Sequence, residues 1–432
     1  MKLLNLFRSQ FGQVGRLGKP ARLFLLALFL DGLLFTAFGL FFNFYILADG
    51  HSREFLGLIN AMPSIAALVF GLPAGMISDR IGRKRSMIIG FTLANIGIIT
   101  MLLVHQPVIM LAMAFLWGAF GQLYALSHAP FMMKVSDDKS RDTLFSLSFG
   151  VFPLASTLGN LLAGVLPGLF SGWFHLGIQS SAAYQAVLLT SVVSSFVVLV
   201  PILLIREPKS QGLDVSVPQK HLSLASTLAI FKRPLTIKLA LPNLVTGLGA
   251  AMVIPYLNLF FVERHHLSDQ ALGILFAVSS LMIGVATFFG PRLVGNLGGK
   301  IRTIVLSQGV SLAFLLVLGF SPFAWLAVLG FLVRGTLMNM AAPFFDAYAM
   351  EHTVEAEQGS VNSLRAWSWN FGWAVGPYLS GLVQQKYGFS PLFLITSVLY
   401  AVSIGLTWLF FGEQVKPLSL AAVPEELPDV LE

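Results

Sequence analysis

The sequence predicts an all-α integral membrane protein with twelve transmembrane helices in two pseudo-symmetric six-helix bundles. Three observations predict this fold: the composition, the spacing of the apolar runs, and a repeat between the two halves. Of the 432 residues, 56% are hydrophobic and 11% are charged, whereas a soluble domain carries about 25% charged residues. So few charges cannot cover a water-exposed surface, which argues against soluble enzymes, nucleic-acid-binding proteins and disordered scaffolds.

A helix that crosses the bilayer needs about 20 mostly apolar residues. Runs of this kind, separated by charged residues, proline or glycine, occur twelve times along the chain. We expect the spans at residues 23–48, 55–77, 86–104, 108–133, 143–170, 182–205, 236–262, 271–294, 304–320, 323–350, 360–385 and 392–412. The first run is too long for a cleavable signal peptide and contains Asp31, so we expect it to be a span.

The distribution of Lys and Arg predicts the orientation of the chain. If the N-terminus is cytoplasmic, 22 of the 27 Lys and Arg residues lie in cytoplasmic segments, and only Arg53, Arg264 and Lys386 lie in outside loops. The other two, Arg334 and Arg365, lie inside spans. Because cytoplasmic loops carry an excess of basic residues, we expect a multi-pass protein of the cell (inner) membrane with both termini cytoplasmic. The net charge of +7 then needs no nucleic-acid partner.

The longest polar connection, from Arg206 to Pro234, divides the spans into six and six. We expect a cytoplasmic N-terminal segment at residues 1–21, bundles at 22–205 and 236–412, a cytoplasmic linker at 206–235 and a cytoplasmic tail at 413–432. The N-terminal segment places apolar residues at helical spacing among basic ones. It is either a helix on the inner membrane surface or a disordered basic tail.

The two halves share short motifs in the same order. The matching pairs are Asp31-Gly32 with Thr246-Gly247, Asn43 with Asn258, Ser52 with Ser268, Gly57 with Gly273, Ala129-Pro130-Phe131 with Ala342-Pro343-Phe344, Gly159 with Gly376, and Gly164 with Gly381. Each match alone is weak, but their common order indicates a duplication. Two similar bundles can enclose a site at their interface and rock about it, which is the geometry that alternating access requires.

The loop after the second span carries a recognisable motif. It reads GMISDRIGRKR, and its motif residues are Gly75, Asp79, Arg80, Gly82, Arg83 and Lys84. In this loop and in its 6+6 organisation the chain resembles the major facilitator superfamily, and is most similar to its 12-span drug/proton antiporter-type exporters. The resemblance covers essentially the whole chain. It implies a transporter in which spans 1, 4, 7 and 10 surround a central cavity.

The physical roles expected of this motif concern gating. Gly75 would allow close helix approach, and Gly82 would permit a tight turn. Asp79 can accept hydrogen bonds from a helix N-terminus or from an arginine across the bundle interface. Such a contact exists in only one of two bundle arrangements, so it would favour the outward-open state. The basic residues that follow Gly82 either join this gate or only set the topology.

Asp31 and Arg334 are charged residues within spans, where ionisable groups are costly and usually functional. Asp31 lies about 13 Å past Arg22 along a helix, and Arg334 lies about 18 Å past Pro322. Both are therefore near the middle of a core about 30 Å thick. The resemblance implies that they face the cavity from opposite halves.

A carboxyl group withdrawn from water favours its neutral form, whereas a nearby arginine or cationic substrate favours its charged form. Asp31 could therefore exchange a proton for a substrate. The alternative is a permanent Asp31–Arg334 ion pair that holds the halves together.

Asp346 and Arg365 flank the loop between spans 10 and 11 at similar distances, which places them at equal depth near its inner end. A structural ion pair would satisfy both charges, and the pair could also belong to an inner gate. Gln122, His128 and Asn339 are further candidates for the cavity. His128 either titrates near neutral pH or is a hydrogen-bonded packing residue.

We expect proton-coupled export of an amphipathic small molecule. The alternatives are uptake of a polar or anionic metabolite, with Arg334 as the anion anchor, and lipid translocation. The sequence contains no metal-ligand spacing, no nucleophile cluster and no phosphate-binding glycine loop, so we expect neither an enzyme nor a cofactor, and a proton gradient as the energy source. The expected partners are a small-molecule substrate and the lipid bilayer, with the protein a monomer.

Overall fold

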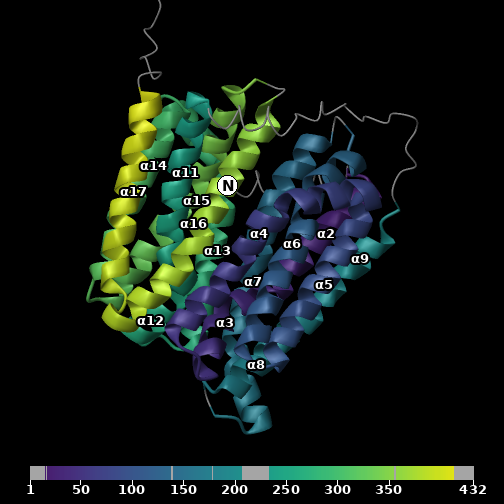
Figure 1. The fold of residues 1–432 in the computed structure, drawn as a ribbon, viewed down its shortest axis with the longest axis vertical. Coiled ribbons are helices and arrows are strands. Elements are labelled where there is room, and N and C mark those ends of the chain that lie inside the picture. The colour runs from purple at the N-terminus through teal and green to yellow at the C-terminus, as the bar shows by residue number, and fades with distance from the viewer. Residues whose placement is uncertain are drawn as a thin grey trace, which may run out of the picture.

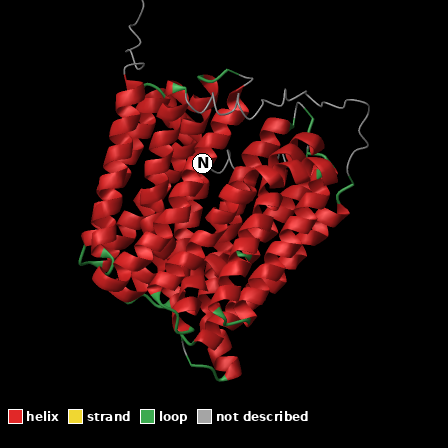
Figure 2. Cartoon of the chain, viewed as in Figure 1, coloured by secondary structure: helices red, strands yellow, loops and turns green. Residues whose placement is uncertain are grey.

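The computed structural model describes residues 15 and 17–412, except 138–139, 178, 207–232 and 355–356, with side chains undescribed at 142 and 287–296. Most of the expected N-terminal segment and linker, and the whole tail after residue 412, lie outside the described residues. Every regular element in the described ranges is a helix (Figure 2).

The first six spans form the N-terminal bundle. Its helices are α2 (Lys19–Leu34), α3 (Thr36–Ala48), α4 (Arg53–Ile81), α5 (Arg83–Leu103), α6 (Pro107–Val135), α7 (Arg141–Phe174), α8 (Ser181–Ser195), the short η1 (Phe196–Val198) and α9 (Leu199–Leu204). The first span consists of α2 and α3, which are separated at Phe35. The Thr36 hydroxyl donates to the Gly32 carbonyl beside this break, a contact that commonly accompanies a bend.

The last six spans form the C-terminal bundle. Its helices are α11 (Pro234–Val253), the short η2 (Ile254–Tyr256), α12 (Leu257–His265), α13 (Asp269–Asn296), α14 (Lys300–Phe320), α15 (Ala324–Glu351), α16 (Gln358–Tyr387) and α17 (Ser390–Phe411). Pro255 interrupts the seventh span because it cannot donate the helical hydrogen bond. The equivalent spans 1 and 7 are thus both broken.

The twelve-helix, two-bundle architecture predicted from the sequence is confirmed. Within the described ranges, eleven spans are long and apolar enough to cross a membrane. The remaining span is α16, which has 30 residues and includes buried Arg365 and Gln384. The predicted run 304–320 lies within α14, which extends over 21 residues from Lys300.

The two bundles meet at one end and diverge at the other. Figure 1 shows them converging near α3 and α12 and separating toward the end where α9 finishes and α11 begins. Across the interface, α4 packs on α16 and α7 packs on α13. We call the two ends of the protein the closed end and the open end.

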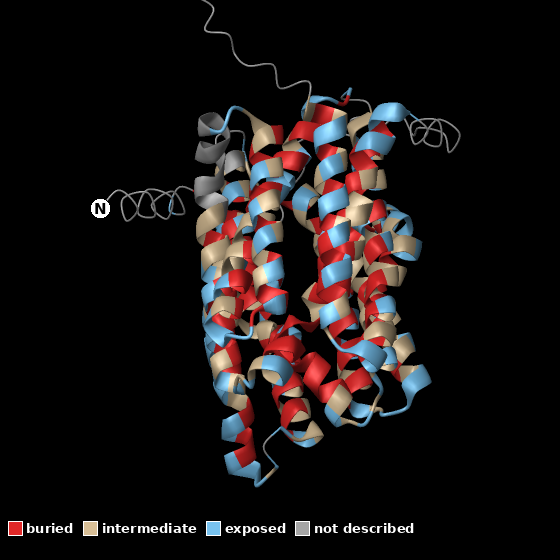
Figure 3. Ribbon diagram, turned by 90° about the vertical axis from the view of Figure 1, so that its left-hand side faces the viewer, coloured by how far each residue is buried: buried red, intermediate tan, exposed pale blue. Residues whose placement is uncertain are grey.

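The buried side chains follow the same division. At the closed end one hydrophobic cluster joins both bundles, with Phe41 and Tyr45 from the N-terminal half and Tyr256 and Phe261 from the C-terminal half. Two further clusters each belong to a single bundle. Figure 3 shows buried and exposed residues alternating along the helices, as expected where one face of each helix packs inward.

Two equivalent asparagines form a reciprocal contact, which we call the asparagine clasp, at the closed end. Asn43 donates to Asn258 at 3.0 Å and to the Pro255 carbonyl at 2.5 Å, while Asn258 donates to the Leu40 carbonyl at 2.8 Å. Leu40 and Pro255 each precede their asparagine by three residues, so the contact follows the repeat. The Asn43 oxygen also accepts from Asn60 at 3.0 Å, which satisfies the buried amide.

Charged and polar contacts surround the clasp. Arg53 forms an ion pair with Glu263 at 2.6 Å and donates to Gln384 at 3.1 Å. Tyr184 donates to Asp269 at 3.2 Å, again between the bundles. Arg53, Glu263 and Asp269 are more exposed than the two asparagines, whereas Tyr184 and Gln384 are as buried as they are. The charged groups therefore form a rim around the buried polar contacts.

Small residues let the bundles approach closely at this end. A Cβ atom on Gly57 would lie 2.4 Å from the Pro377 carbonyl oxygen, and one on Gly273 would lie 2.6 Å from the Cα of Gly164. A Cβ on Gly381 would lie 2.3 Å from the Arg53 carbonyl oxygen. These glycines are repeat equivalents, so the duplication builds both sides of the same interface.

We predict that Gly57→Ala shifts the protein toward an arrangement in which this end is open. The added methyl group cannot fit against the Pro377 carbonyl, although alanine would otherwise favour the helix by about 1 kcal/mol. Because the chain contains no cysteine, spin labels at Ala48→Cys and Arg264→Cys can report the distance across the closed end.

The matched control is Gly71→Ala in the same helix, where a Cβ would meet no atom within 4 Å. A label distance that lengthens in Gly57→Ala and not in Gly71→Ala is expected. Unchanged distances in both variants would show that this glycine contact does not hold the closed end.

Candidate functional site

The motif loop keeps its contacts within the N-terminal bundle. Gly82 has φ +91°, which suits glycine in the tight turn between α4 and α5. Asp79 forms an ion pair with Arg83 four residues on, and Arg83 also donates to Ser78 at 2.9 Å. Among the described residues, Asp79 thus pairs locally, and not with an arginine across the interface. This is the pattern expected if its interdomain contact belongs to the other bundle arrangement.

The remaining motif residues differ in environment. Lys84 donates to the Leu203 and Ile205 carbonyls at 2.9 and 2.7 Å, where it satisfies groups at the end of α9. Arg80 is exposed. A Cβ atom on Gly75 would meet nothing within 4 Å. Gly75 therefore makes no close helix approach in this arrangement, and its role in gating stays a prediction.

Asp31 lies partly buried on α2, beside the hydroxyl group of Tyr124 on α6. The Tyr124 oxygen has no hydrogen-bond partner of standard geometry in the described ranges. A phenol next to a carboxyl group can donate when the carboxylate is charged and can accept when it is protonated. Sequence reasoning missed Tyr124, because a tyrosine in an apolar span is usually read as a packing residue.

His128 completes this group from the next turn of α6. Its ring lies edge-on to Tyr124, with centroids 4.3 Å apart, and edge-on to Phe24 at 5.5 Å. The buried His128 Nε2 atom has no hydrogen-bond partner among the described residues. We call Asp31, Tyr124 and His128 the carboxyl cluster. Gln122 is partly buried two residues before Tyr124, which places it on a different face of α6.

Arg334 does not pair with Asp31. It is 5% exposed, donates to the Tyr400 hydroxyl on α17 at 2.5 Å, and lies over the Tyr400 ring at 5.6 Å. Its guanidinium therefore points into the C-terminal bundle, and no ion pair between Arg334 and Asp31 occurs in the described ranges. The expectation that both charges face the central cavity was wrong for Arg334: the depth was estimated from the sequence, but the rotation of the helix was not.

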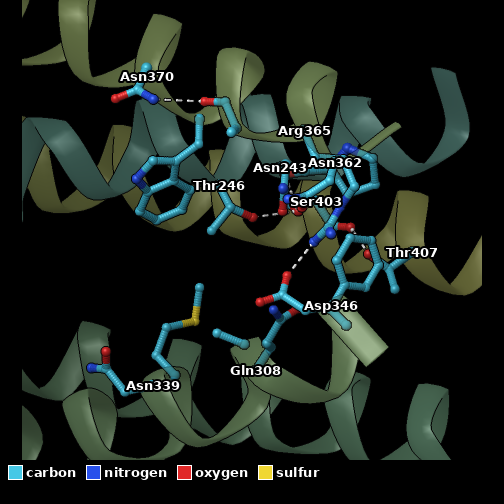
Figure 4. Close-up of a pocket in the computed structure, with 16 residues that line it drawn as sticks. Asn243, Thr246, Gln308, Asn339, Asp346, Asn362, Arg365, Asn370, Ser403 and Thr407 are labelled. Atoms are coloured by element: carbon cyan, nitrogen blue, oxygen red, sulfur yellow. Dashed lines mark hydrogen bonds and ion pairs between the residues drawn. The ribbon is translucent and has the colours of Figure 1, made fainter. Parts of the chain in front are cut away.

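A polar pocket of about 420 Å³ lies within the C-terminal bundle. Helices α11, α14, α15, α16 and α17 supply its walls, and Figure 4 shows its side chains converging. The polar residues that line it are Asn243, Thr246, Gln308, Asn339, Asp346, Asn362, Arg365, Asn370, Ser403 and Thr407. We call it the amide pocket. Polar groups inside a transmembrane bundle are costly unless protein, water or a ligand supplies their hydrogen bonds.

Asp346 and Arg365 lie together in this pocket, joined by a hydrogen-bonded ion pair at 2.6 Å (Figure 4). The pair is asymmetric, because the Arg365 side chain is 4% exposed and the Asp346 side chain is 66% exposed. The Arg365 guanidinium also lies over the Phe345 ring at 5.1 Å. The arginine is thus anchored in the bundle and holds the carboxylate toward the cavity.

Several amide groups in the pocket are available to a ligand. Asn243 and Asn362 make no side-chain hydrogen bond with any described residue, and the buried Gln308 Oε1 atom is likewise unpartnered in those ranges. Asn339 lines the pocket and donates to the Gly335 carbonyl at 2.8 Å, and its oxygen has no hydrogen-bond partner among the described residues. No group of three or more metal-ligating side chains is present in the described ranges.

The repeat relates the carboxyl cluster to the amide pocket. Asp31 is the equivalent of Thr246, which lines the pocket, and the adjacent glycines pack in equivalent ways. A Cβ on Gly32 would lie 2.6 Å from the Phe152 carbonyl oxygen, and one on Gly247 would lie 3.1 Å from that of Trp369. The cluster and the pocket therefore occupy corresponding positions in the two halves, at similar depth.

A family model described as Major Facilitator Superfamily matches residues 24–242 and again residues 239–428. The chain belongs to this superfamily. It is therefore a multi-pass membrane transporter, and the two successive matches agree with the duplication read from the sequence.

The relatives to which this chain is similar include proteins named for multidrug resistance. The chain is 25% identical over 394 residues to the multidrug resistance protein MdtG of Dickeya zeae (strain Ech586), covering 89% of this chain and 92% of the relative. It is 28% identical over 196 residues to MdtG of Salmonella arizonae, covering 44% and 47%.

Solved structures share the fold at low sequence identity. The nucleoside transporter NupG superposes with a TM-score of 0.67 at 16% identity, covering 91% of this chain and 98% of its own. A bacterial homologue of the human lysosomal transporter Spinster, described as inward-facing and occupied, gives a TM-score of 0.69 at 13% identity, covering 90% and 95%. These similarities establish the arrangement of helices.

Proposed function

We propose that the protein exports a small molecule by alternating access, with Asp31 exchanging a proton for the substrate. The observation that carries this proposal is the carboxyl cluster: an acid held in a span beside the Tyr124 hydroxyl, at the position that the repeat relates to the polar pocket of the other bundle. The similarity to MdtG proteins, which are named for multidrug resistance, supports export.

The bundle arrangement supports a loading state for export. By the excess of Lys and Arg, we place the open end and both termini at the cytoplasm. The clasp and its rim then close the outside, and the carboxyl cluster and amide pocket face the cytoplasm. A substrate would enter from within the cell, and rocking of the bundles would carry it outward.

The pocket also refines the class of substrate. The charge of Asp346 is compensated by Arg365, but its other carboxylate oxygen and the unpartnered amides favour a ligand with several hydrogen-bonding groups, including N–H donors such as those of an ammonium group. The exposed Trp369 offers an aromatic wall on one side. The substrate is therefore amphipathic, with a polar head in the amide pocket. Anionic substrates are disfavoured, because Arg334 is withdrawn against Tyr400.

The direct test uses proteoliposomes that contain the purified protein and a pH-sensitive dye. Ethidium, an aromatic cation, and chloramphenicol, a neutral polar molecule, are added across a pH gradient. Movement of a compound that dissipates the gradient would support coupled transport, and we expect it for the cation. Uptake of a compound at the same rate with and without the gradient would contradict proton coupling.

A further inference from the structure

A second, apolar cavity lies on the outside of the C-terminal bundle, between α14 and α17. Its volume is about 690 Å³, and Val305, Leu306, Gly309, Leu312 and Ile404 contribute to its walls. Leu306 is 52% exposed and Trp408, at one end, is 49% exposed, so the cavity opens sideways toward the bilayer. It shares no residue with the amide pocket. We call it the lateral groove.

Two glycines form the floor of the lateral groove. A Cβ atom on Gly309 of α14 or on Gly405 of α17 would meet no atom within 4 Å. Larger residues at these positions would project into the groove and fill it. The groove is therefore a hollow that small residues on two adjacent helices create together.

The length of the groove matches one leaflet of a bilayer. From Arg302 to Leu312 the lining of α14 extends over ten residues, or about 15 Å. This is half of a hydrocarbon core about 30 Å thick. Trp408 lies at the same end as Arg302, and tryptophan is enriched at the membrane–water interface. The groove thus runs from the interface to the middle of the membrane.

A single cation marks the interfacial end of the groove. Arg302 is the third residue of α14, and it forms no ion pair with any residue in the described ranges. Its neighbour Lys300, in contrast, pairs with Glu351. A guanidinium with free donors at headgroup depth is suited to phosphate oxygens. Basic sites between helices on the cytoplasmic side bind anionic headgroups.

We propose that the lateral groove is a specific site for one phospholipid with an anionic headgroup. Arg302 holds the headgroup, and an acyl chain lies over Gly309 and Gly405 in the hollow. The orientation from the positive charges places this lipid in the cytoplasmic leaflet. Helices α14 and α17 also contribute walls of the amide pocket. A bound lipid would therefore stabilise the packing of the two helices on the side away from that pocket.

Native mass spectrometry of the purified full-length protein tests this site. The protein in detergent is titrated with palmitoyl-oleoyl phosphatidylglycerol and, in parallel, with the phosphatidylcholine of the same chains. We expect tighter retention of phosphatidylglycerol by the unmodified protein. Arg302→Gln should weaken that retention about fivefold, the equivalent of about 1 kcal/mol for one basic residue near a membrane surface.

Two controls separate this site from general lipid binding. Gly405→Leu should abolish retention of both lipids at this site, whereas Gly168→Leu, at an open position of α7, should not. Arg206→Gln, outside the groove, should leave the preference for phosphatidylglycerol intact. An equal loss of phosphatidylglycerol retention in Arg302→Gln and Arg206→Gln would overturn the proposal. It would also be overturned if the protein were a dimer that Gly405→Leu dissociates, because the groove would then be occupied by a second copy of the chain. If Gly405→Leu does not fold, Arg302→Gln alone decides.

Discussion

Asp31→Asn is expected to reduce substrate movement driven by a pH gradient to the level of protein-free vesicles. Asparagine has nearly the shape of a protonated aspartate but cannot release a proton, so the exchange of a proton for substrate is removed. The protein should still fold, because Asp31 forms no ion pair with another described residue.

The same variant should retain exchange of labelled for unlabelled substrate at equal pH on both sides. That process requires alternating access and binding, but no net proton movement. Asp137→Asn, a surface carboxyl beside Ser140, is the matched control and should be active in both assays. Gradient-driven flux that survives in Asp31→Asn would assign the coupling to another group.

The second large effect concerns the ion pair in the amide pocket. Asp346→Ala should lower the free energy of unfolding by about 2–3 kcal/mol, because it leaves the buried Arg365 guanidinium without its ion-pair partner. This value is smaller than for a fully buried pair, because the carboxylate is exposed to solvent. Arg365→Ala should cost less, since the carboxylate it leaves is already exposed. The double variant should have about the same free energy of unfolding as Arg365→Ala. A denaturant titration in mixed micelles would measure these values.

The matched control for this cycle is the ion pair of Lys300 and Glu351 near the end of α14, whose side chains are 26% and 56% exposed. Removing either partner there should change stability by less than about 1 kcal/mol. Additive losses for Asp346→Ala and Arg365→Ala would show that the two residues stabilise the bundle independently.

The sequence predicted the fold well, because the signals for membrane spans are local. The basic residues and the apolar runs are read along the chain without knowledge of packing, and all twelve predicted spans correspond to helices. Even α16, which is less apolar than the other spans, was predicted as the run 360–385.

The candidate site was predicted less completely, because the sequence does not fix how a helix is rotated. The depth of Arg334 was estimated along its helix, but its guanidinium contacts Tyr400 within the C-terminal bundle. Tyr124 and His128 are four residues apart on one helix, so their shared face could have been read from the sequence. Their proximity to Asp31 depends on how α2 packs against α6.

The asparagine clasp shows that a sequence repeat identifies equivalent residues but does not predict whether they contact each other. Sequence alone identified Asn43 and Asn258 as equivalents, but it gave no sign that they contact each other. Residues close to a two-fold axis meet their own counterparts, and this follows only once the two bundles are placed together. The clasp therefore needed the structure, although both of its members had already been named.

The most direct test of the coupling mechanism is proton release on substrate binding. The purified protein, in weakly buffered detergent solution with a pH indicator, is mixed with a cationic compound that the proteoliposome assay has shown to be transported. The unmodified protein should release protons as Asp31 becomes charged, and Asp31→Asn should bind the compound without releasing any. Equal proton release by both proteins would contradict the exchange of proton for substrate at Asp31.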